Sequence, residues 1–280
     1  MKAVRFWSSP SWSARIGRML VMLFVLVTAS AMFFENRIIY FPSKDGIYEA
    51  NHGFPIQRVT FNSDDGVRLD GAFCPVDHSR GTILWCHGNG GNLSDGFGVA
   101  GEFRKLGVSV FLFDYRGYGR SEGEPNSKGV ILDAEAAYRY VTKNLSVPPS
   151  RLVILGESLG GAPAIRMASR HDCAGLITQS TFTSIRDMAG VAFPYFPWLR
   201  FFVRTDFPNL DDIGRVRVPK LVIHSRTDEV VPFWMAEKLF AEAKEPKDLW
   251  VIDRAGHNAT FGLPGYMDRI RAFLDRVLSA

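Results

Sequence analysis

Cysteine is scarce in this sequence, and its three occurrences are not spaced for a shared role. Cys74, Cys86 and Cys173 are an odd number in a chain of 280 residues, and no two of them lie close together. Disulfide-rich scaffolds and cysteine-based metal sites need paired or regularly spaced cysteines. The sequence gives no sign of either, so we expect buried free thiols, which leave the cellular compartment open.

Acidic residues are absent from the first 34 positions, which carry four basic ones, Lys2, Arg5, Arg15 and Arg18. Without these four, the 33 Lys and Arg fall to 29, which equals the 29 Asp and Glu, so the formal charge of +4 resides in this segment. A nucleic-acid surface needs basic residues spread over the fold. The remaining chain is neutral, and we expect no nucleic-acid partner.

Internal repeats and low-complexity tracts are also missing. The chain is 46% apolar and 22% charged, which is ordinary for a folded protein with a sizeable core. These values exclude disordered, collagen-like and coiled-coil proteins.

An uncharged apolar run follows the basic segment, from Met19 to Phe34. As a helix, its 16 residues would span roughly 24 Å, slightly less than a bilayer core of ~30 Å. A core helix of a globular protein is disfavoured because the run has no polar face. Two membrane interpretations stay open.

In the first interpretation, the run is an uncleaved transmembrane anchor. In the second, it is the core of a signal peptide that is cleaved near Ala31, within the small residues Ala29-Ser30-Ala31. We favour the anchor, because apolar residues continue through Phe34 beyond that site. The basic flank precedes the run, so the N-terminus is expected in the cytoplasm and the remaining chain on the opposite, periplasmic or extracytoplasmic, side.

From about residue 56, short β-rich runs alternate with helix-length stretches. The first two expected strands form a hairpin around a turn at residues 64–66, and the other six are continuous apolar runs, typical of strands buried on both faces. The strands are expected at Gln57–Asn62, Val67–Phe73, Thr82–Cys86, Val108–Phe113, Leu152–Leu155, Gly175–Thr178, Leu221–His224 and Leu249–Ile252. Helices are expected at about 95–106, 127–144, 159–170, 233–243 and 264–278.

This order predicts an α/β fold with a mostly parallel sheet of about eight strands and helices on both faces. We divide the chain into a basic segment (1–18), the anchor or signal-peptide core (19–34), a juxtamembrane linker (35–55) and a folded domain (56–280). Within the domain, residues 180–218, here called the cap, form a short insertion rich in aromatic residues. The cap is either an apolar lid that shapes an acyl pocket or a roof whose aromatics pack on the sheet.

The strongest chemical signal is Gly156-Glu157-Ser158-Leu159-Gly160-Gly161, which lies between an expected strand and an expected helix. A G-x-S-x-G turn in this context holds a serine hydroxyl clear of the sheet, beside a helix N-terminus. Ser158 is therefore the candidate nucleophile.

A serine nucleophile needs a base, and the base needs an orienting carboxylate. His257 follows the last expected strand, and Asp228 follows the strand before it. The carboxyl ends of parallel strands share one edge of a sheet, so the three side chains can converge. We assign Ser158 as nucleophile, His257 as general base and then acid, and Asp228 as the group that orients the imidazole.

A second glycine-rich run, His87-Gly88-Asn89-Gly90-Gly91-Asn92, follows the expected strand at 82–86, and we call it the Gly-rich loop. It lacks the third glycine of a dinucleotide fingerprint and the Gly-Lys-Ser/Thr of a phosphate loop. We expect the backbone N–H groups of Asn89 and Leu159 to form an oxyanion hole. The alternative is a simple tight turn.

Together these motifs resemble the alpha/beta-hydrolase superfamily, and the resemblance covers nearly the whole chain. It is carried by HGNGGN at 87–92, FDYRGYGRSEG at 113–123, GESLGG at 156–161, D-x-x-V-P at 228–232 and GH at 256–257. The branch that it resembles most is that of small, membrane-anchored serine hydrolases, with bud-emergence-type proteins and protein depalmitoylases, often described as serine-aminopeptidase-like. One departure is Ser225, where relatives usually have glycine.

The sequence therefore predicts a membrane-anchored serine hydrolase that forms an acyl-enzyme. The expected substrate is a small-molecule or lipid-acyl ester or thioester. A peptidase and a non-enzymatic binding protein on the same fold are the alternatives, although all three members of the expected triad are present. No cofactor and no metal are implied.

Overall fold

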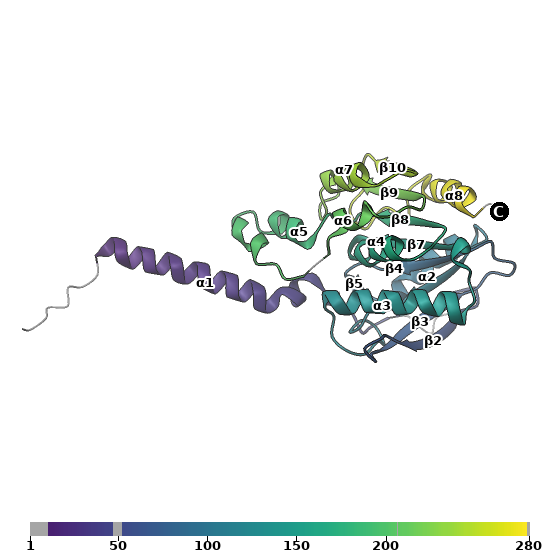
Figure 1. The fold of residues 1–280 in the computed structure, drawn as a ribbon, viewed down its shortest axis with the longest axis horizontal. Coiled ribbons are helices and arrows are strands. Elements are labelled where there is room, and N and C mark those ends of the chain that lie inside the picture. Colours follow the sequence, from purple (N-terminus) through teal and green to yellow (C-terminus); the bar gives the residue numbers. More distant parts are fainter. Residues whose placement is uncertain (1–10, 47–51, 206, 279–280) are drawn as a thin grey trace, which may run out of the picture.

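A computed structural model describes residues 11–46, 52–205 and 207–278 (Figure 1). Among these residues, eight strands form the main sheet, in the order β10-β9-β8-β7-β4-β6-β3-β2. Their bounds are β2 Gln57–Asn62, β3 Arg68–Cys74, β4 Thr82–Cys86, β6 Ser109–Phe113, β7 Leu152–Glu157, β8 Gly175–Gln179, β9 Lys220–Ser225 and β10 Lys247–Ile252.

The six strands from β10 to β6 run parallel, while β2 and β3 form the expected antiparallel hairpin at one edge of the sheet. Every residue of β4, β6, β8 and β9 is buried. Burial on both faces explains why these strands are continuous apolar runs in the sequence. The predicted α/β class and the mostly parallel sheet of eight strands are confirmed.

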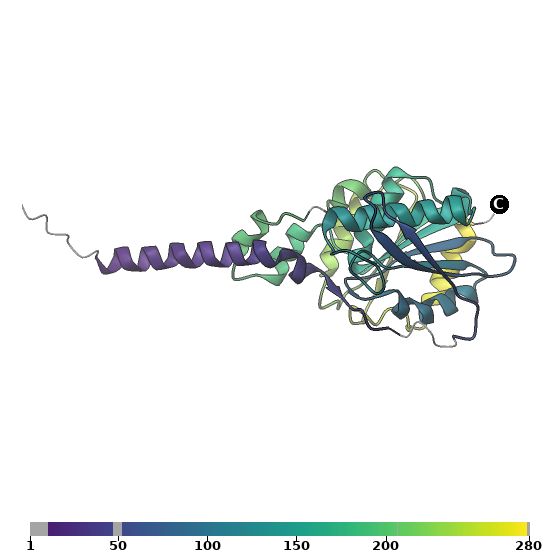
Figure 2. The same ribbon diagram turned by 90° about the horizontal axis from the view of Figure 1, so that it is seen from below.

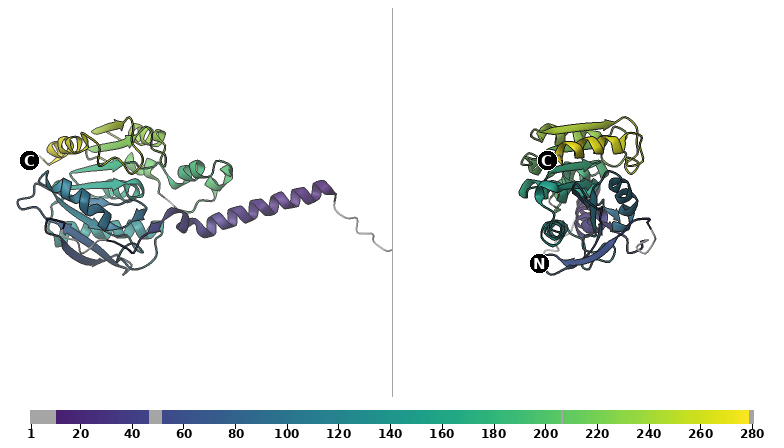
Figure 3. Two further views of the ribbon diagram at one scale, coloured as in Figure 1. Left: turned by 180° about the vertical axis from the view of Figure 1, so that it is seen from behind. Right: turned by 90° about the vertical axis from the view of Figure 1, so that its right-hand side faces the viewer.

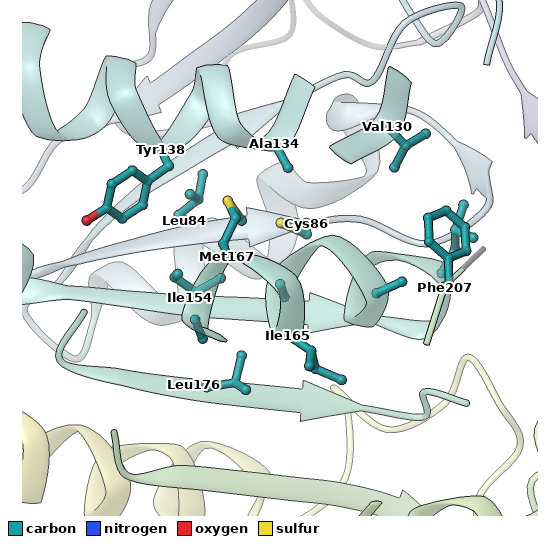
Figure 4. Packing of buried hydrophobic residues seen from close by; sticks show 14 of the residues in the cluster. Leu84, Cys86, Val130, Ala134, Tyr138, Ile154, Ile165, Met167, Leu176 and Phe207 are labelled. Carbon is teal, nitrogen blue, oxygen red and sulfur yellow. The ribbon is translucent and has the colours of Figure 1, made fainter. Parts of the chain in front are cut away.

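Helices cover both faces of the sheet (Figure 2). One apolar core lies under α3 (Ser127–Arg139), α4 (Gly161–Arg170) and α7 (Phe233–Glu242), and Figure 4 shows part of this packing around Met167. The other core lies under α2 (Gly96–Arg104) and α8 (Tyr266–Val277). The five expected helices are therefore present.

Turns that are not α-helical overlap three of the expected helix ranges. The stretch at 95–106 is preceded by the 3-10 turn η1 (Leu93–Asp95), and 159–170 begins with the 3-10 turn η4 (Ser158–Gly160). The stretch at 127–144 ends in the π-helical turn η2 (Tyr140–Asn144). Periodicity cannot distinguish these tighter or wider turns from α-helix, because the same side chains face the core.

The N-terminal helix α1 (Trp12–Ile39) projects away from the domain (Figures 1 and 3). It contains the whole apolar run 19–34 and continues through residues 35–39, which we had expected to belong to the linker. The N–H of Tyr40 closes the last turn on the carbonyl of Asn36 at 2.9 Å. Of the four basic residues before the run, Arg15 and Arg18 belong to α1, whereas Lys2 and Arg5 lie outside the described residues.

Directly after α1, the chain pairs with the Gly-rich loop in a small parallel sheet. Strand β1 (Phe41–Pro42) lies beside β5 (Gly90–Gly91). The Phe41 N–H donates to the carbonyl of Asn89 at 2.9 Å, and the Ser43 N–H donates to that of Gly91 at 3.1 Å. The sequence did not predict these two-residue strands, which are too short to show a pattern.

The cap contains α5 (Ile185–Ala192), the 3-10 helix η5 (Pro197–Phe201) and the short α6 (Asn209–Ile213). Helix α5 and the segment after it lie beside α1 in both Figure 1 and Figure 2, whereas α6 packs on α4 and α7. The cap therefore extends from the carboxyl edge of the sheet along the N-terminal helix.

Candidate active site

The carboxyl ends of β7, β9 and β10 bring Ser158, Asp228 and His257 together. The Ser158 Oγ lies 3.0 Å from the His257 Nε2. The His257 Nδ1 lies 2.8 Å and 2.9 Å from the two carboxylate oxygens of Asp228. The three side chains form one continuous hydrogen-bonded chain, in the order that a general-base-activated serine requires.

Ser158 occupies a sharp turn between β7 and α4, with a φ of 49°. A non-glycine residue in this left-handed region costs of order 1–3 kcal/mol, which the surrounding structure must offset. Two glycines make the turn possible. A Cβ on Gly160 would lie 2.0 Å from the Cys86 carbonyl oxygen, and a Cβ on Gly161 would lie 2.0 Å from the Thr181 Oγ1. The same Thr181 hydroxyl donates to the Ser158 carbonyl at 2.7 Å.

The Asp228 carboxylate is buried and fully engaged. Besides His257, its Oδ1 accepts the backbone N–H groups of Val230 at 2.9 Å and Val231 at 2.8 Å. Burial by itself would raise the pKa of Asp228, but these hydrogen bonds and that of His257 outweigh it and lower the pKa below its ordinary value. The carboxylate is therefore ionised and can hold the imidazole in one orientation.

Two neighbours of the triad have roles that sequence reasoning did not assign. The Glu229 carboxylate accepts the backbone N–H of His257 at 3.1 Å, so it fixes the loop that carries the histidine. The His224 Nε2 lies 2.8 Å from the Val231 carbonyl and 3.4 Å from the Asp228 Oδ2. Burial lowers the pKa of His224, which favours its neutral form beside the aspartate. For Glu229, the signal available in the sequence was its position directly after Asp228.

The Gly-rich loop lies against the serine, since a Cβ on Gly88 would stand 3.7 Å from the Ser158 Cβ. Two tyrosines of the 113–123 motif donate hydrogen bonds to backbone carbonyls of this loop. The Tyr115 hydroxyl donates to the His87 carbonyl at 3.2 Å, and the Tyr118 hydroxyl donates to the Asn89 carbonyl at 2.8 Å. The Tyr118 bond fixes the peptide between Asn89 and Gly90, and the preceding peptide, which carries the Asn89 N–H, has its Gly88 carbonyl 2.8 Å from the His87 Nδ1.

A cavity of about 310 Å³ opens at the triad, and Asn89, Ser158, Leu159 and His257 all line it. Its remaining lining is dominated by apolar residues of the cap and of α1. The two residues expected to supply oxyanion donors therefore border the same space as the serine hydroxyl. Cavities of this size accept small ligands or parts of larger ones.

No cluster of three or more His, Cys, Asp or Glu in the described ranges could hold a metal ion. Cys74, Cys86 and Cys173 are buried and unbonded to each other. Burial raises the pKa of the Cys74 and Cys173 thiols to about 12, so both are protonated at neutral pH.

This chain is similar to known proteins in sequence and in fold. The family model described as alpha/beta hydrolase fold matches residues 81–213. A protein from Arabidopsis thaliana named as the alpha/beta hydrolase domain-containing protein WAV2 is 34% identical over 236 residues, which are 75% of this chain and 76% of that protein. The chain belongs to the alpha/beta hydrolase family.

Two further relatives match over most of their length. An uncharacterized protein of Mycobacterium tuberculosis is 37% identical over 265 residues, covering 91% of this chain and 93% of that protein. A Saccharomyces cerevisiae relative, named as an uncharacterized membrane protein, is 31% identical and covers 91% of this chain and 94% of its own. Among solved structures, an esterase of Pyrococcus furiosus superposes with a TM-score of 0.74 at 23% identity, covering 86% of this chain and 98% of that one, which shows the shared fold.

Proposed function

We propose that this alpha/beta hydrolase is a membrane-anchored serine hydrolase that cleaves carboxylic esters or acyl thioesters through an acyl-enzyme. The observation that carries the proposal is the hydrogen-bonded chain from Ser158 through His257 to Asp228. A serine hydroxyl in such a chain can lose its proton as it attacks a carbonyl carbon.

In the acylation step, the Ser158 Oγ attacks the substrate carbonyl carbon while its proton passes to the His257 Nε2. The carbonyl oxygen becomes negative and accepts hydrogen bonds from the backbone N–H groups of Asn89 and Leu159, each worth roughly 3 kcal/mol to the transition state. His257 then gives the proton to the leaving alcohol or thiol as its bond to the acyl carbon breaks. The ionised Asp228 stabilises the imidazolium in between.

In the deacylation step, a water molecule attacks the acyl carbon and gives one proton to His257. The bond between the acyl carbon and the Ser158 Oγ breaks, and the proton returns to that oxygen as the carboxylic acid leaves. The enzyme is thereby restored, so the cycle needs no redox partner.

The apolar lining of the cavity supports an acyl group rather than a peptide as the bound portion of the substrate. An aminopeptidase needs a free carboxylate to bind the substrate amino group. Glu35 borders the cavity, but its oxygens accept the backbone N–H groups of Arg204 and Thr205, at 3.1 Å and 2.6 Å. Peptide or aminoacyl amide hydrolysis is therefore the disfavoured alternative.

The anchor interpretation of the N-terminus is supported by the length and exposure of α1. Among the described residues, α1 is the one helix long and apolar enough to cross a membrane. Arg15 and Arg18 precede its apolar run, so the positive-inside rule puts the N-terminus in the cytoplasm and the hydrolase domain on the other side. A mature protein that begins near Ala31, found by mass spectrometry, would instead support a cleaved signal peptide.

The test is labelling of the membrane-embedded full chain by a fluorophosphonate, which reacts with activated serines. The wild type is expected to label, whereas Ser158→Ala and His257→Ala are expected to remain unlabelled while keeping their fold by circular dichroism. Folded wild-type protein that resists the probe would contradict the proposal and favour a binding role. Acyl esters, acyl thioesters and aminoacyl amides, offered side by side, then separate the substrate classes.

A further inference from the structure

The N-terminal helix forms a wall of the cavity that contains the candidate nucleophile. Ala31, Met32, Glu35, Ile38 and Ile39, all from α1, line the cavity together with Ser158. A helix that served only as a tether would not need to reach the reactive serine.

The wall runs lengthwise along α1. Ile39 lies at the catalytic end, because its carbonyl accepts a hydrogen bond from the Asn89 side-chain amide at 3.2 Å. Ala31 lies eight positions earlier, which is about 12 Å along a helix that rises 1.5 Å per residue. Ala31 also belongs to the apolar run 19–34. The cavity therefore extends from the triad toward the part of α1 that is suited to the bilayer.

The cap supplies the other wall, and polar contacts fasten it to α1. The buried Glu35 carboxylate accepts the N–H groups of Arg204 and Thr205 and also the Arg204 Nε at 3.3 Å. The Arg204 guanidinium also donates to the Met32 carbonyl. These contacts use backbone donors of the cap, so they fix the position of the chain itself and not only of a side chain.

Aromatic residues continue the contact farther down α1. The Trp198 indole N–H donates to the Thr28 hydroxyl at 3.1 Å. The Phe24 ring lies with its centroid 5.3 Å from that of Trp198 and 6.2 Å from that of Phe202. Phe24 precedes the end of the apolar run at Phe34 by ten positions, or about 15 Å of helix. The cap therefore extends along α1 as far as Phe24, which lies within the apolar run 19–34.

The outer surface of the cap has the composition of a membrane-contacting face. Tyr195 is 87% exposed and Phe201 is 72% exposed, although both are large aromatic residues. On α1, the residues from Met19 to Leu26 are also exposed, although Phe24 among them contacts the cap. A bilayer that contained the apolar run of α1 would also reach the cap aromatics that contact this run, Trp198 and Phe202.

We propose that the cavity between α1 and the cap is an acyl-chain site that opens into the bilayer, with the cap seated in the lipid leaflet. The substrate is then the acyl chain of a membrane-embedded ester or thioester, which moves along α1 until its carbonyl carbon reaches Ser158. This proposal rests on the serine hydrolase activity proposed above, and it assigns α1 a binding role in addition to anchoring.

The first experiment measures chain-length preference with the full chain reconstituted in vesicles. The readout is the ratio of kcat/KM for p-nitrophenyl decanoate to kcat/KM for p-nitrophenyl acetate, which does not depend on the fraction of active protein. Ala31→Trp narrows the cavity, and Ala29→Trp is the matched control because Ala29 is exposed on the same helix. Each buried methylene is worth about fourfold in binding, so excluding two of them lowers the ratio about sixteenfold.

We expect Ala31→Trp to lower this ratio at least tenfold and Ala29→Trp to leave it unchanged. An unchanged ratio in Ala31→Trp, with acetate turnover present, would overturn the acyl-chain site and leave the serine hydrolase proposal standing. Wild-type protein that neither hydrolyses acetate nor reacts with a fluorophosphonate would overturn both.

Vesicles can also distinguish the two sources of acyl chains. One set carries a monoacylglycerol, and the other carries a lipid-anchored peptide with the same acyl group on a cysteine. Turnover of either one in the bilayer, with the Ala31→Trp defect, supports the site and identifies the source. Turnover of neither by an enzyme that cleaves the soluble acetate would overturn it.

The position of the cap is tested by cysteine labelling, because the three native cysteines are buried. Phe201→Cys is compared with Ala272→Cys, an exposed position on α8 at the end of the domain far from α1 (Figure 1). With a membrane-impermeant maleimide, we expect Phe201→Cys in vesicles to react at least ten times more slowly. Equal reaction rates would place the cap in water and contradict its seating in the leaflet.

Discussion

Replacement of Asp228 by asparagine tests the proposed role of the carboxylate without changing its shape. The Oδ1 of Asp228 accepts two backbone N–H groups, from Val230 and Val231, at 2.9 Å and 2.8 Å. In Asp228→Asn, the amide oxygen must occupy this position, so the NH₂ group takes the position of Oδ2, which lies 2.8 Å from the His257 Nδ1. The oxygen at the Oδ1 position also lies 2.9 Å from Nδ1, but it already accepts two backbone N–H groups. The NH₂ group at the shorter distance can only donate, which favours Nδ1 as the acceptor and puts the ring proton on Nε2.

In that tautomer, the Nε2 of His257 carries a proton toward Ser158 and cannot remove another one. A triad with its histidine held in the wrong tautomer typically loses about 10⁴-fold in kcat, equivalent to roughly 5 kcal/mol. We therefore expect Asp228→Asn to keep its thermal unfolding temperature within a few degrees and to lose about 10⁴-fold in kcat for a p-nitrophenyl ester. Asp253→Asn, at an aspartate with a 94% exposed side chain, is the control and should be fully active. A loss below tenfold in Asp228→Asn would refute the reasoning.

Three further substitutions test the structure around the serine. Gly161→Ala puts a Cβ 2.0 Å from the Thr181 hydroxyl, so it should lower the unfolding temperature by several degrees. Gly98→Ala is the control, because nothing lies within 4 Å of its Cβ, and it should not lower the unfolding temperature. Equal unfolding temperatures for the two variants would contradict this packing. Tyr118→Phe removes a hydrogen bond to the Asn89 carbonyl in the Gly-rich loop, so kcat should fall about fivefold with KM little changed. A change in KM alone would argue against a role of Tyr118 in positioning this loop. Burial raises the pKa of Glu157 to about 7, so ionisation destabilises the fold as pH rises from about 4.5 to 7. Glu157→Gln should therefore gain thermal stability over the wild type between pH 5 and pH 8, and a constant difference would show that Glu157 does not ionise in this range.

The sequence predicted the sheet well because its physical signal is local. A strand buried on both faces must be apolar throughout, as Leu152–Leu155 is, and a turn such as Gly156–Gly161 needs small residues where the backbone passes close to neighbours. The convergence of Ser158, Asp228 and His257 was also predicted, because the carboxyl ends of parallel strands meet at one edge of the sheet.

The remaining features depend on contacts between distant segments, which a single sequence does not show. The pairing of β1 with β5 joins residues 41–42 to residues 90–91, and each strand is too short to have a pattern. Glu35 was expected in a linker, but it accepts hydrogen bonds from a backbone 169 positions later in the chain. The helices of the cap are short, and their aromatic residues do not share one face, since Trp198 contacts α1 while Phe201 is exposed. Hydrophobic periodicity alone therefore did not reveal these helices.

The central claim is that Ser158 is an activated nucleophile, and mass spectrometry tests it most directly. Trypsin releases residues 152–166 as LVILGESLGGAPAIR, in which Ser158 is the one serine. After reaction of the membrane-embedded chain with a fluorophosphonate, we predict the adduct mass on this peptide in the wild type and its absence in His257→Ala. An adduct on another peptide, or an unmodified peptide 152–166 in folded wild-type protein, would contradict the account.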